Sequence, residues 1–392
     1  MDAREEEAID TLVLYTIVHG YGNNSGPSVA PPVARLPRAI GGESGAKYIH
    51  RLLYGNRPDL CHKVLRLQRD AFIALVNIFI ERKYLQEGRF IKVAEIIAMS
   101  LFIFARGASY REVEDRFQHC PATVGIYHHQ VLEAFVKLSA DVIRPFQSQH
   151  TVHNSIVSSP RFYWPFFKDC IGALDGTHID CVVADEQGQR FRNRKGRKSW
   201  NILCVVNFDM MFTYVNVGWE GSTHDLPVLK DSLTQRKYDF PHPEPGKYYL
   251  VDSAYPNSIG FLAPYIAPTV RKHIPEFKSG RRCGNFPEGM EELFNYRHAS
   301  LRGVIERTFG VLKATWKIVD DRMPQMNLNS QLEIVIAVCT VHNFMRLHEC
   351  GIPITPRPPS SNRTAYVDLF DKKSKKAMDN FRDQLALEIA ES

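Results

Sequence analysis

Apolar residues recur at helical spacing through the first third of the chain. This periodicity is clearest in two segments, LRLQRDAFIALVNIFIERKYL at 65–85 and VAEIIAMSLFIFARG at 93–107. Gly107 ends the second segment, at the position where a residue in the left-handed conformation often terminates a helix. The spacing predicts an all-helical region over 47–150.

Within this region, a short helix, a tight break and a longer helix follow one another, which is the order of a helix-turn-helix module. Ser109 and Glu112 form a capping-box pattern before the short helix, and the longer helix is expected over 123–143. Charge does not favour DNA reading here, since 91–145 holds six Lys or Arg and six Asp or Glu. A helical packing unit without DNA contact fits the region as well.

From about residue 165 the pattern becomes that of strands. β-branched and aromatic runs occur at 170–184, 199–208, 212–219 and 248–252. A helix is expected at 223–233, and two long helices at about 290–317 and 330–348. Strands followed by helices predict an α/β domain over 165–350.

The two ends of the chain differ in composition from these regions. Residues 21–46 are rich in Gly, Pro and Ser, so 1–46 is predicted to be a flexible N-terminal segment. Residues 351–392 read as a C-terminal tail, a linker followed by a polar helix-like stretch. This tail contains KKSKK at 372–376, close to a nuclear-import composition, although such runs are more often a solvated surface.

Composition restricts the class of protein only loosely. The net charge of +6 and pI of about 8.8 allow nucleic acid as a partner without requiring it. The eight cysteines form no CxxC pair, which indicates reduced core residues rather than a zinc finger. The longest apolar runs are about half a membrane span, so we expect no membrane segment. His128 and His129 are expected at a surface or an interface rather than as ligands.

Two aspartates stand at special places in the strand runs. Period-two alternation puts Ile171, Ala173 and Asp175 on one face, where a carboxylate is costly unless it is paired or bound to a cation. Asp252 ends the strand YYLVD, and the carboxyl ends of strands are where sites form in open α/β sheets. Each aspartate has a plainer interpretation as a turn residue.

Glu306 and Asp225 are further acidic candidates. Glu306 borders a helical apolar stripe and is flanked by Gly303 and Gly310, two glycines that suggest close approach of backbone or DNA. Its plainer interpretation is a boundary residue paired with Arg302, one turn earlier. Asp225 follows Ser222 at capping-box spacing, although it could line the same cleft. The cleft-lining candidates are His178, His224, Asp225 and Arg302.

Two strand acids and a helix acid can converge on a hard cation. Oxygen-only ligands suit Mg²⁺ or Mn²⁺ rather than zinc. Such a site can support an in-line displacement at phosphorus by a two-metal mechanism, with one metal on the attacking oxygen and one on the leaving oxygen. The sequence does not distinguish the two metals.

The segment GQRFRNRKGRKSWN at 188–201, called the basic segment below, has a dense cluster of positive charge. Its position between two strands suits phosphate contacts, and Phe191 and Trp200 could add stacking on bases. A solvated loop is the alternative. The predicted DNA-binding residues are Arg190, Arg192, Arg194, Lys195, Arg197 and Lys198.

Several motifs together resemble the PIF/Harbinger transposases and the nucleases derived from them, including plant ALP-like proteins of the DDE endonuclease superfamily. These motifs are GALDGTHI, FRNRKGRKSWNILCVVNFD, GSTHDLPVL, VDSAYP, NYRHASLRGVIERTFGVLK and AVCTVHNFM, and the resemblance covers about 47–350. It implies an RNase H-like catalytic domain, a helix-turn-helix-like N-terminal domain and a DDE triad of Asp175, Asp252 and Glu306.

One departure bears on how the protein would find DNA. Gly125 and Ile126 stand where relatives usually have a serine and a basic residue, which favours dependence on a Myb/SANT-like partner. The resemblance and the acids lead to the hypothesis of a nuclear, divalent-metal-dependent DNA endonuclease, with the cytoplasm as a second compartment and a homo-oligomer as an option. The alternative is a catalytically silent adaptor in a chromatin complex.

Overall fold

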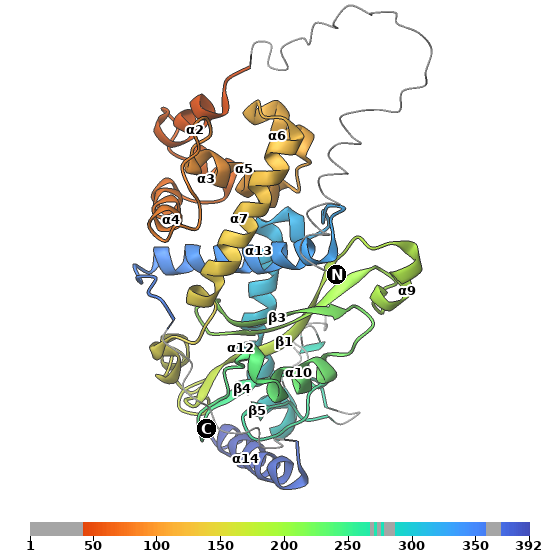
Figure 1. The fold of residues 1–392 in the computed structure, drawn as a ribbon. Helices are drawn as coiled ribbons and strands as arrows, with labels where there is room; N and C mark the ends of the chain where they lie inside the picture. The colour runs from red at the N-terminus through yellow and green to blue at the C-terminus, as the bar shows by residue number, and fades with distance from the viewer. Residues whose placement is uncertain (1–41, 267–269, 273–275, 278–286, 358–369) are drawn as a thin grey trace, which may run out of the picture. The chain divides into compact units, whose positions relative to one another are not determined.

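A computed structural model describes residues 42–266, 270–272, 276–277, 287–357 and 370–392 (Figure 1). Residues 42–392 form one compact unit. Most of the segment predicted to be flexible, residues 1–41, lies outside the described residues. No helix in the described ranges is both long and apolar enough to cross a membrane.

Short and medium helices make up the first part of the unit. They are α2 (Gly45–Tyr54), α3 (Leu60–Leu65), α4 (Arg69–Glu81), α5 (Val93–Arg106), α6 (Tyr110–Phe117), α7 (Pro121–Val142) and α8 (Asn154–Val157), with a 3-10 turn at Gln147–His150. The helix predicted at 65–85 is α4, which is shorter at both ends, and α2 begins inside the segment predicted to be flexible. Whether 47–150 and 165–350 are separate domains stays a prediction.

Local capping signals set the helix ends that the sequence predicted best. α5 ends at Gly107, whose φ of 61° is the left-handed conformation that glycine adopts without strain. The capping box of Ser109 and Glu112 is formed at the start of α6. His128, expected at a surface or an interface, is buried on α7 and contacts Ser100 Oγ through Nδ1 at 3.0 Å.

A five-stranded mixed sheet forms the second part, which confirms the α/β prediction. Its strands are β1 (Cys170–Asp180), β2 (Ser199–Val206), β3 (Phe212–Glu220), β4 (Tyr248–Leu250) and β5 (Phe261–Leu262). The order is β3-β2-β1-β4-β5. β1, β2 and β3 pair antiparallel, whereas β4 lies parallel to both β1 and β5. The two-residue strand β5 was not predicted, because it lies in a stretch of irregular sequence.

A bulge near the start of β1 changes which residues share a face. The register with β4 shifts between Cys170 and Gly172. Ile171 therefore packs with Leu174 on one face, whereas Ala173 packs into the other. The predicted common face of Ile171 and Asp175 is wrong, since strict alternation holds only after the bulge.

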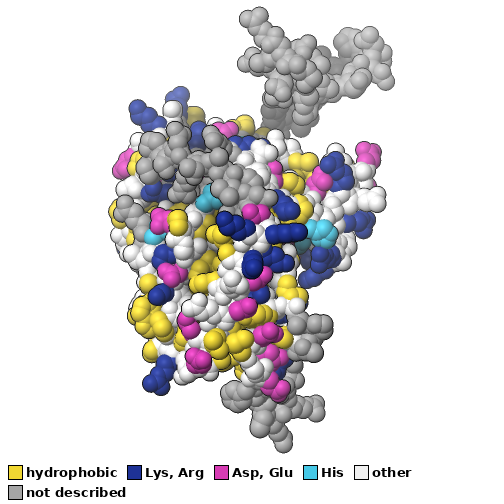
Figure 2. All heavy atoms as spheres, turned by 90° about the horizontal axis from the view of Figure 1, so that it is seen from below, with side chains coloured by type: hydrophobic (Ala, Val, Ile, Leu, Met, Phe, Trp, Pro, Cys, Tyr) yellow, Lys and Arg dark blue, Asp and Glu magenta, His cyan; other side chains and the backbone are white. Residues whose placement is uncertain are grey.

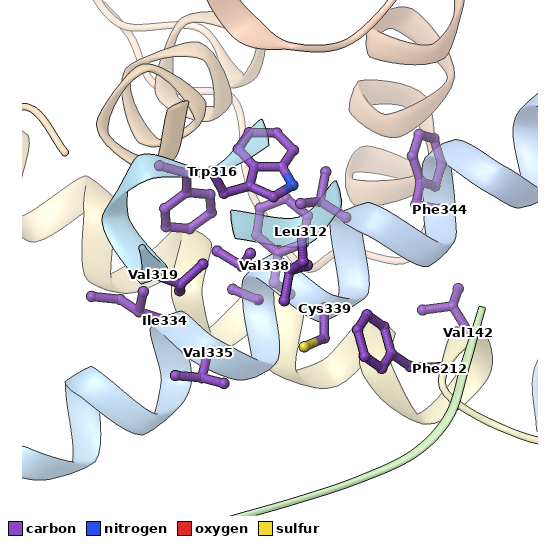
Figure 3. Packing of buried hydrophobic residues seen from close by; sticks show 14 of the residues in the cluster. Val142, Phe212, Leu312, Trp316, Val319, Ile334, Val335, Val338, Cys339 and Phe344 are labelled. Carbon is purple, nitrogen blue, oxygen red and sulfur yellow. The ribbon is translucent and has the colours of Figure 1, made fainter. Parts of the chain in front are cut away.

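Helices cover both faces of the sheet. α10 (Asp225–Thr234) packs on the face of Leu174, while α12 (Gly289–Thr315) and α13 (Leu328–Glu349) pack on the other face. The apolar stripe predicted for α12, from Leu301 to Trp316, is buried as expected. Figure 3 shows part of this core, where Trp316 and Leu312 meet residues of α13. Smaller helical turns are α9 (Gly188–Phe191) and 3-10 turns at Asp185–Gln187, Arg236–Tyr238 and Lys317–Val319.

One buried asparagine joins the helical part to the sheet. Asn343 of α13 has no exposed surface. Its Nδ2 donates to the carbonyls of Val142 and Phe212 at 2.8 and 2.6 Å, and its Oδ1 accepts from Phe212 N at 2.8 Å. The last turn of α7 and the first residue of β3 are thereby tied to one side chain.

The C-terminal tail contributes a helix to the fold. α14 (Lys372–Ala390) packs against α12 and β5 and buries Met378 and Leu385. Ser374 Oγ accepts a hydrogen bond from Ile259 N at 2.9 Å, and Tyr265 donates to Asp383 at 2.6 Å. The basic run at 372–376 is therefore the first turn of a packed helix. The seven cysteines among the described residues are free, and five of them are buried.

Candidate active site

Asp175 lies on β1, and Asp252 follows the end of the parallel strand β4 by two residues. Ala173 pairs with Leu250 at the end of the β1–β4 ladder, so each aspartate lies two residues beyond this pair. Asp252 is near enough for its negative charge to raise the pKa of Asp175. Asp252 Oδ1 also accepts from Ala254 N at 2.8 Å, so the expected turn interaction is present as well.

Arg302 connects the strand acid to the helix acid. Its Nη1 donates to Asp175 Oδ2 at 2.8 Å, and its Nη2 donates to Glu306 Oε1 at 2.5 Å. The predicted pairing of Glu306 with Arg302 is therefore present, and Arg302 holds Asp175 at the same time. This bridge ties α12 to β1. The Arg302 side chain is only 7% exposed, so the contact is largely shielded from water.

Burial dominates the electrostatics of Asp175. Removal from water raises the pKa of this carboxyl to about 7, although Arg302 opposes the shift. Asp252 and then Asp225 add to the rise, because each is a negative charge within reach. Gly176 N also donates to Asp175 Oδ1 at 2.8 Å. Both oxygens of Asp175 thus accept a hydrogen bond. The negative charges of Asp252 and Asp225 still act on this carboxyl, against the one positive charge of Arg302.

The glycines around Glu306 do not mark a close approach within this chain. A Cβ at Gly310 would meet nothing within 4 Å in the described structure, and one at Gly303 would meet only the end of the Arg307 side chain at 3.2 Å. The Glu306 side chain is 60% exposed. The helix surface around Glu306 is therefore open to solvent.

Asp225 lies across β1 from Asp175, on the side covered by α10. A Cβ at Gly176 would come within 2.5 Å of Asp225 Oδ1, so glycine is needed for α10 to approach the strand. Asn201 Nδ2 donates to Asp225 Oδ1 at 2.8 Å. The expected capping box with Ser222 is wrong, since His224 is the N-cap residue and Asp225 begins the helix.

The two histidine candidates are also on this side of β1. His178 contacts Ser199 Oγ through Nδ1 at 3.0 Å, and Asp225 acts on its charge. Burial lowers the pKa of His178 despite that carboxylate. His224 Nδ1 accepts from Arg194 at 3.0 Å. The cleft-lining candidates are thus split by the strand, with Arg302 on the side of α12.

Lys313 is a site residue that the sequence analysis missed. Its Nζ donates to the carbonyl of His178 at 2.7 Å and to Thr177 Oγ1 at 3.3 Å. Burial lowers the pKa of its ammonium group. The available signal was spacing, because Lys313 lies two helical turns after Glu306 and so shares its face.

Half of the predicted DNA-binding residues are already in ion pairs. Arg190 pairs with Glu220 at 2.5 Å, Arg197 pairs with Asp180, and Lys198 pairs with Asp185 at 2.7 Å. These acids come from the flanking strands and from the turn before α9, so counting charge along the segment alone overstated its free charge. Within this basic segment, residues 188–201, three exposed cations have no acidic partner among the described residues. They are Arg192, Arg194 and Lys195.

The predicted aromatic stacking is wrong. Phe191 and Trp200 are 4% and 3% exposed and pack edge to face with ring centroids 5.0 Å apart. Because their faces are covered, they anchor the basic segment to β2 and cannot stack on bases. Figure 2 shows a face of the molecule where lysine and arginine side chains lie beside histidines and acids.

The donor set fits a hard divalent cation in its chemistry. Asp175, Asp252 and Glu306 offer only carboxylate oxygens, and the Arg302 guanidinium shows that the site accepts a positive charge. Within the described ranges, however, no three acid, histidine or cysteine side chains already converge as metal ligands do. Glu306 would have to exchange its contact with Arg302 before it could join the other two.

Comparisons with known proteins identify relatives of this region. Residues 174–343 match the family described as DDE superfamily endonuclease, and 42–137 match a domain of unknown function, DUF8040. "Putative nuclease HARBI1" of Rattus norvegicus is 23% identical over 274 residues, covering 69% of this chain and 72% of that protein. "Protein ALP1-like" of Arabidopsis thaliana is 25% identical over 236 residues, covering 55% of this chain and 54% of that protein.

Among solved structures, a piggyBac transposase synaptic complex with hairpin DNA aligns over 91% of this chain and 82% of that chain. The aligned residues are 11% identical and the TM-score is 0.34, which is too low to support a common fold. The family assignment therefore rests on the sequence matches. Residues 174–343 form a DDE superfamily endonuclease domain, and the chain is a homologue of HARBI1 and ALP1-like proteins, the Harbinger-derived nuclease family.

Proposed function

We propose that this protein is a divalent-metal-dependent DNA endonuclease that hydrolyses phosphodiester bonds. The observation that carries the proposal is the proximity of Asp175 on β1 to Asp252, just after the parallel strand β4, with Glu306 linked to Asp175 through Arg302. The strand order β3-β2-β1-β4-β5, with two antiparallel and two parallel pairings, supports an RNase H-like assignment of the sheet. DNA as the substrate follows from the endonuclease family.

The residues of the site have separate tasks in this proposal. Asp175, Asp252 and Glu306 would hold Mg²⁺ or Mn²⁺ in a two-metal arrangement, and the metal would supply neutralisation of phosphate charge and activation of water. Arg302 keeps the Asp175 carboxylate oriented through its 2.8 Å hydrogen bond. The exposed cations of the basic segment hold the DNA backbone, because unpaired arginine and lysine side chains are the usual phosphate contacts.

An Asp175→Asn variant should lose nicking of supercoiled plasmid in Mn²⁺ by about a hundredfold or more, because the amide removes a negative metal ligand. DNA binding should stay unchanged, since the basic segment is separate from this carboxylate. Asp115→Asn, at an exposed position of α6, is the matched control and should keep full activity. Nicking by Asp175→Asn at the wild-type rate would reject the assignment.

The basic segment gives a second test, based on salt dependence. Replacing Arg192, Arg194 and Lys195 by Ala should reduce the slope of log K against log salt by about 3, because each lost phosphate contact releases about one counterion less. The matched control replaces Arg190, Arg197 and Lys198, which removes the same charge from ion-paired positions. Equal slopes for the two triple variants would show that only the total charge matters.

A second candidate function is a catalytically silent adaptor in a chromatin complex. The observation that favours it is the Arg302 bridge, since two of the three acids have a partner that stabilises the fold without chemistry. Targeting by a Myb/SANT-like protein fits the start of α7, where Ile126 is 61% exposed and Gly125 packs against Tyr110. Nicking that depends on Asp175 would reject the adaptor as the sole function. We propose the nucleus as the compartment for either function, with the cytoplasm as a second compartment.

A further inference from the structure

Arg302 occupies the position between the strand acid and the helix acid of the proposed catalytic site. Its two terminal nitrogens reach different carboxylates, Asp175 on β1 at 2.8 Å and Glu306 on α12 at 2.5 Å. The planar guanidinium suits this geometry, because its donors lie in a fixed fork. A cation that used both carboxylates would have to compete with Arg302 for at least one of them.

The two carboxylates differ in how firmly they are held. The Asp175 side chain is 16% exposed and has a donor on each oxygen, Gly176 N on one and Arg302 on the other. The Glu306 side chain is 60% exposed and shares Arg302 through one oxygen. Glu306 is therefore the acid that can change partners at low cost.

The charge balance favours such an exchange. When all three are ionised, Asp175, Asp252 and Glu306 carry three formal negative charges, and Arg302 supplies one positive charge. The remaining negative charge attracts a divalent cation, and it is strengthened by burial of the Asp175 end of the site. Lys313 is the next cation along the same helix face, but it is engaged by the carbonyl of His178.

We propose that Arg302 is a positioning residue that competes with the divalent cation for Glu306 and so sets how tightly the cation binds. This inference rests on the proposed function. In the metal-free protein, Arg302 holds both acids. When the cation binds, Glu306 leaves Arg302, whose other nitrogen keeps Asp175 in place.

Mn²⁺ binding to the full chain tests this inference without any measurement of cleavage. Free Mn²⁺ is followed by electron paramagnetic resonance during titration of the wild type and of variants at Arg302, Arg307 and Asp175. Arg302→Gln should bind Mn²⁺ roughly tenfold more tightly, because the competing charge is gone. Arg302→Lys keeps the charge but can make only one of the two contacts, so it should fall between Arg302→Gln and the wild type.

Arg307→Gln is the matched control. Arg307 lies on the same helix, is exposed, and has no carboxylate partner among the described residues. Its removal should leave Mn²⁺ affinity within about twofold of the wild type, because a solvated charge is screened. Tightening in both arginine variants would mean that net charge alone sets the affinity, which overturns the exchange.

The outcomes separate this inference from the proposed function. Weaker Mn²⁺ binding in Arg302→Gln, together with loss of binding in Asp175→Asn, would show that Arg302 only supports the site and overturn the exchange alone. Wild-type binding in Asp175→Asn would overturn the proposed metal site and the exchange with it. Circular dichroism reports folding, and if Arg302→Gln does not fold, Arg302→Lys carries the test, with binding no tighter than wild type counting against the exchange.

Discussion

An Asn343→Leu variant is expected to lose about 4 kcal/mol of unfolding free energy, the cost of leaving three buried backbone groups without partners. Leucine has the same number of side-chain heavy atoms and the same branching as asparagine, so none of the loss comes from a cavity. The groups left unsatisfied are the N–H and the carbonyl of Phe212 and the carbonyl of Val142. Because they belong to β3 and α7, the loss should weaken the joint between the helical part and the sheet.

Urea unfolding followed by circular dichroism measures this loss directly. Asn329→Leu, the same substitution at an exposed position in the first turn of α13, is the control and should change stability by less than about 0.5 kcal/mol. If Asn343→Leu behaved like Asn329→Leu, the hydrogen bonds of Asn343 would contribute nothing beyond the packing of its side chain. A split into two unfolding transitions would place the lost coupling at this joint.

Acid should destabilise the metal-free protein steeply below pH 6.5. Burial lowers the pKa of His128 and His298 to about 3 and that of His342 to about 4. The unfolded chain binds these protons near pH 6.5 and the folded chain does not, so the stability present above pH 6.5 is lost as pH falls. Three such groups remove about 6 kcal/mol between pH 6.5 and 5, at 1.4 kcal/mol for each pH unit and group.

Asp175 works in the opposite direction. Its pKa is raised to about 7 in the folded protein, so the folded state binds a proton that the unfolded chain takes up only near its ordinary value of 3.8. Its contribution is therefore present at low pH and lost as pH rises through 7. Between pH 7 and 5, protonation of Asp175 adds about 3 kcal/mol to the unfolding free energy. The net loss of unfolding free energy from all four groups is then about 3 kcal/mol.

Urea unfolding at pH 7, 6 and 5 in EDTA tests both signs. His342→Gln should reduce the histidine part of the loss by about a third, since one of three titrating groups is removed. Asp175→Asn should steepen the loss, because the opposing group is removed. A stability that does not change between pH 7 and 5 in all three proteins would contradict the assignment of these buried groups.

Local signals in the sequence predicted the helix ends well. Features that depend on pairing between distant strands were not predicted. Gly107 and Ser109 mark helix ends through contacts within a few residues, so the sequence alone contains the cause. The bulge at Gly172 depends on the partner strand β4, and it moved Ile171 to the opposite face. Strict period two cannot show such a shift.

The candidate site shows the same division. Asp175 and Asp252 were found because each follows an apolar strand run, and the separation of Arg302 from Glu306 predicted their pairing one turn apart. That Arg302 also reaches Asp175 depends on how α12 packs against β1. The ion pairs that occupy half of the basic segment likewise join it to residues on other elements, such as Glu220.

The docked position of α14 bears on how copies of this protein stay apart. β5 is the last strand of the sheet on its side, and a bare strand edge is a template for pairing with another chain. α14 packs against β5, where its Ser374 receives the N–H of Ile259 and its apolar side chains meet the core. A chain shortened before residue 370 would lose this cover. Self-association and aggregation are then the expected fate of a protein trimmed to the matched endonuclease region.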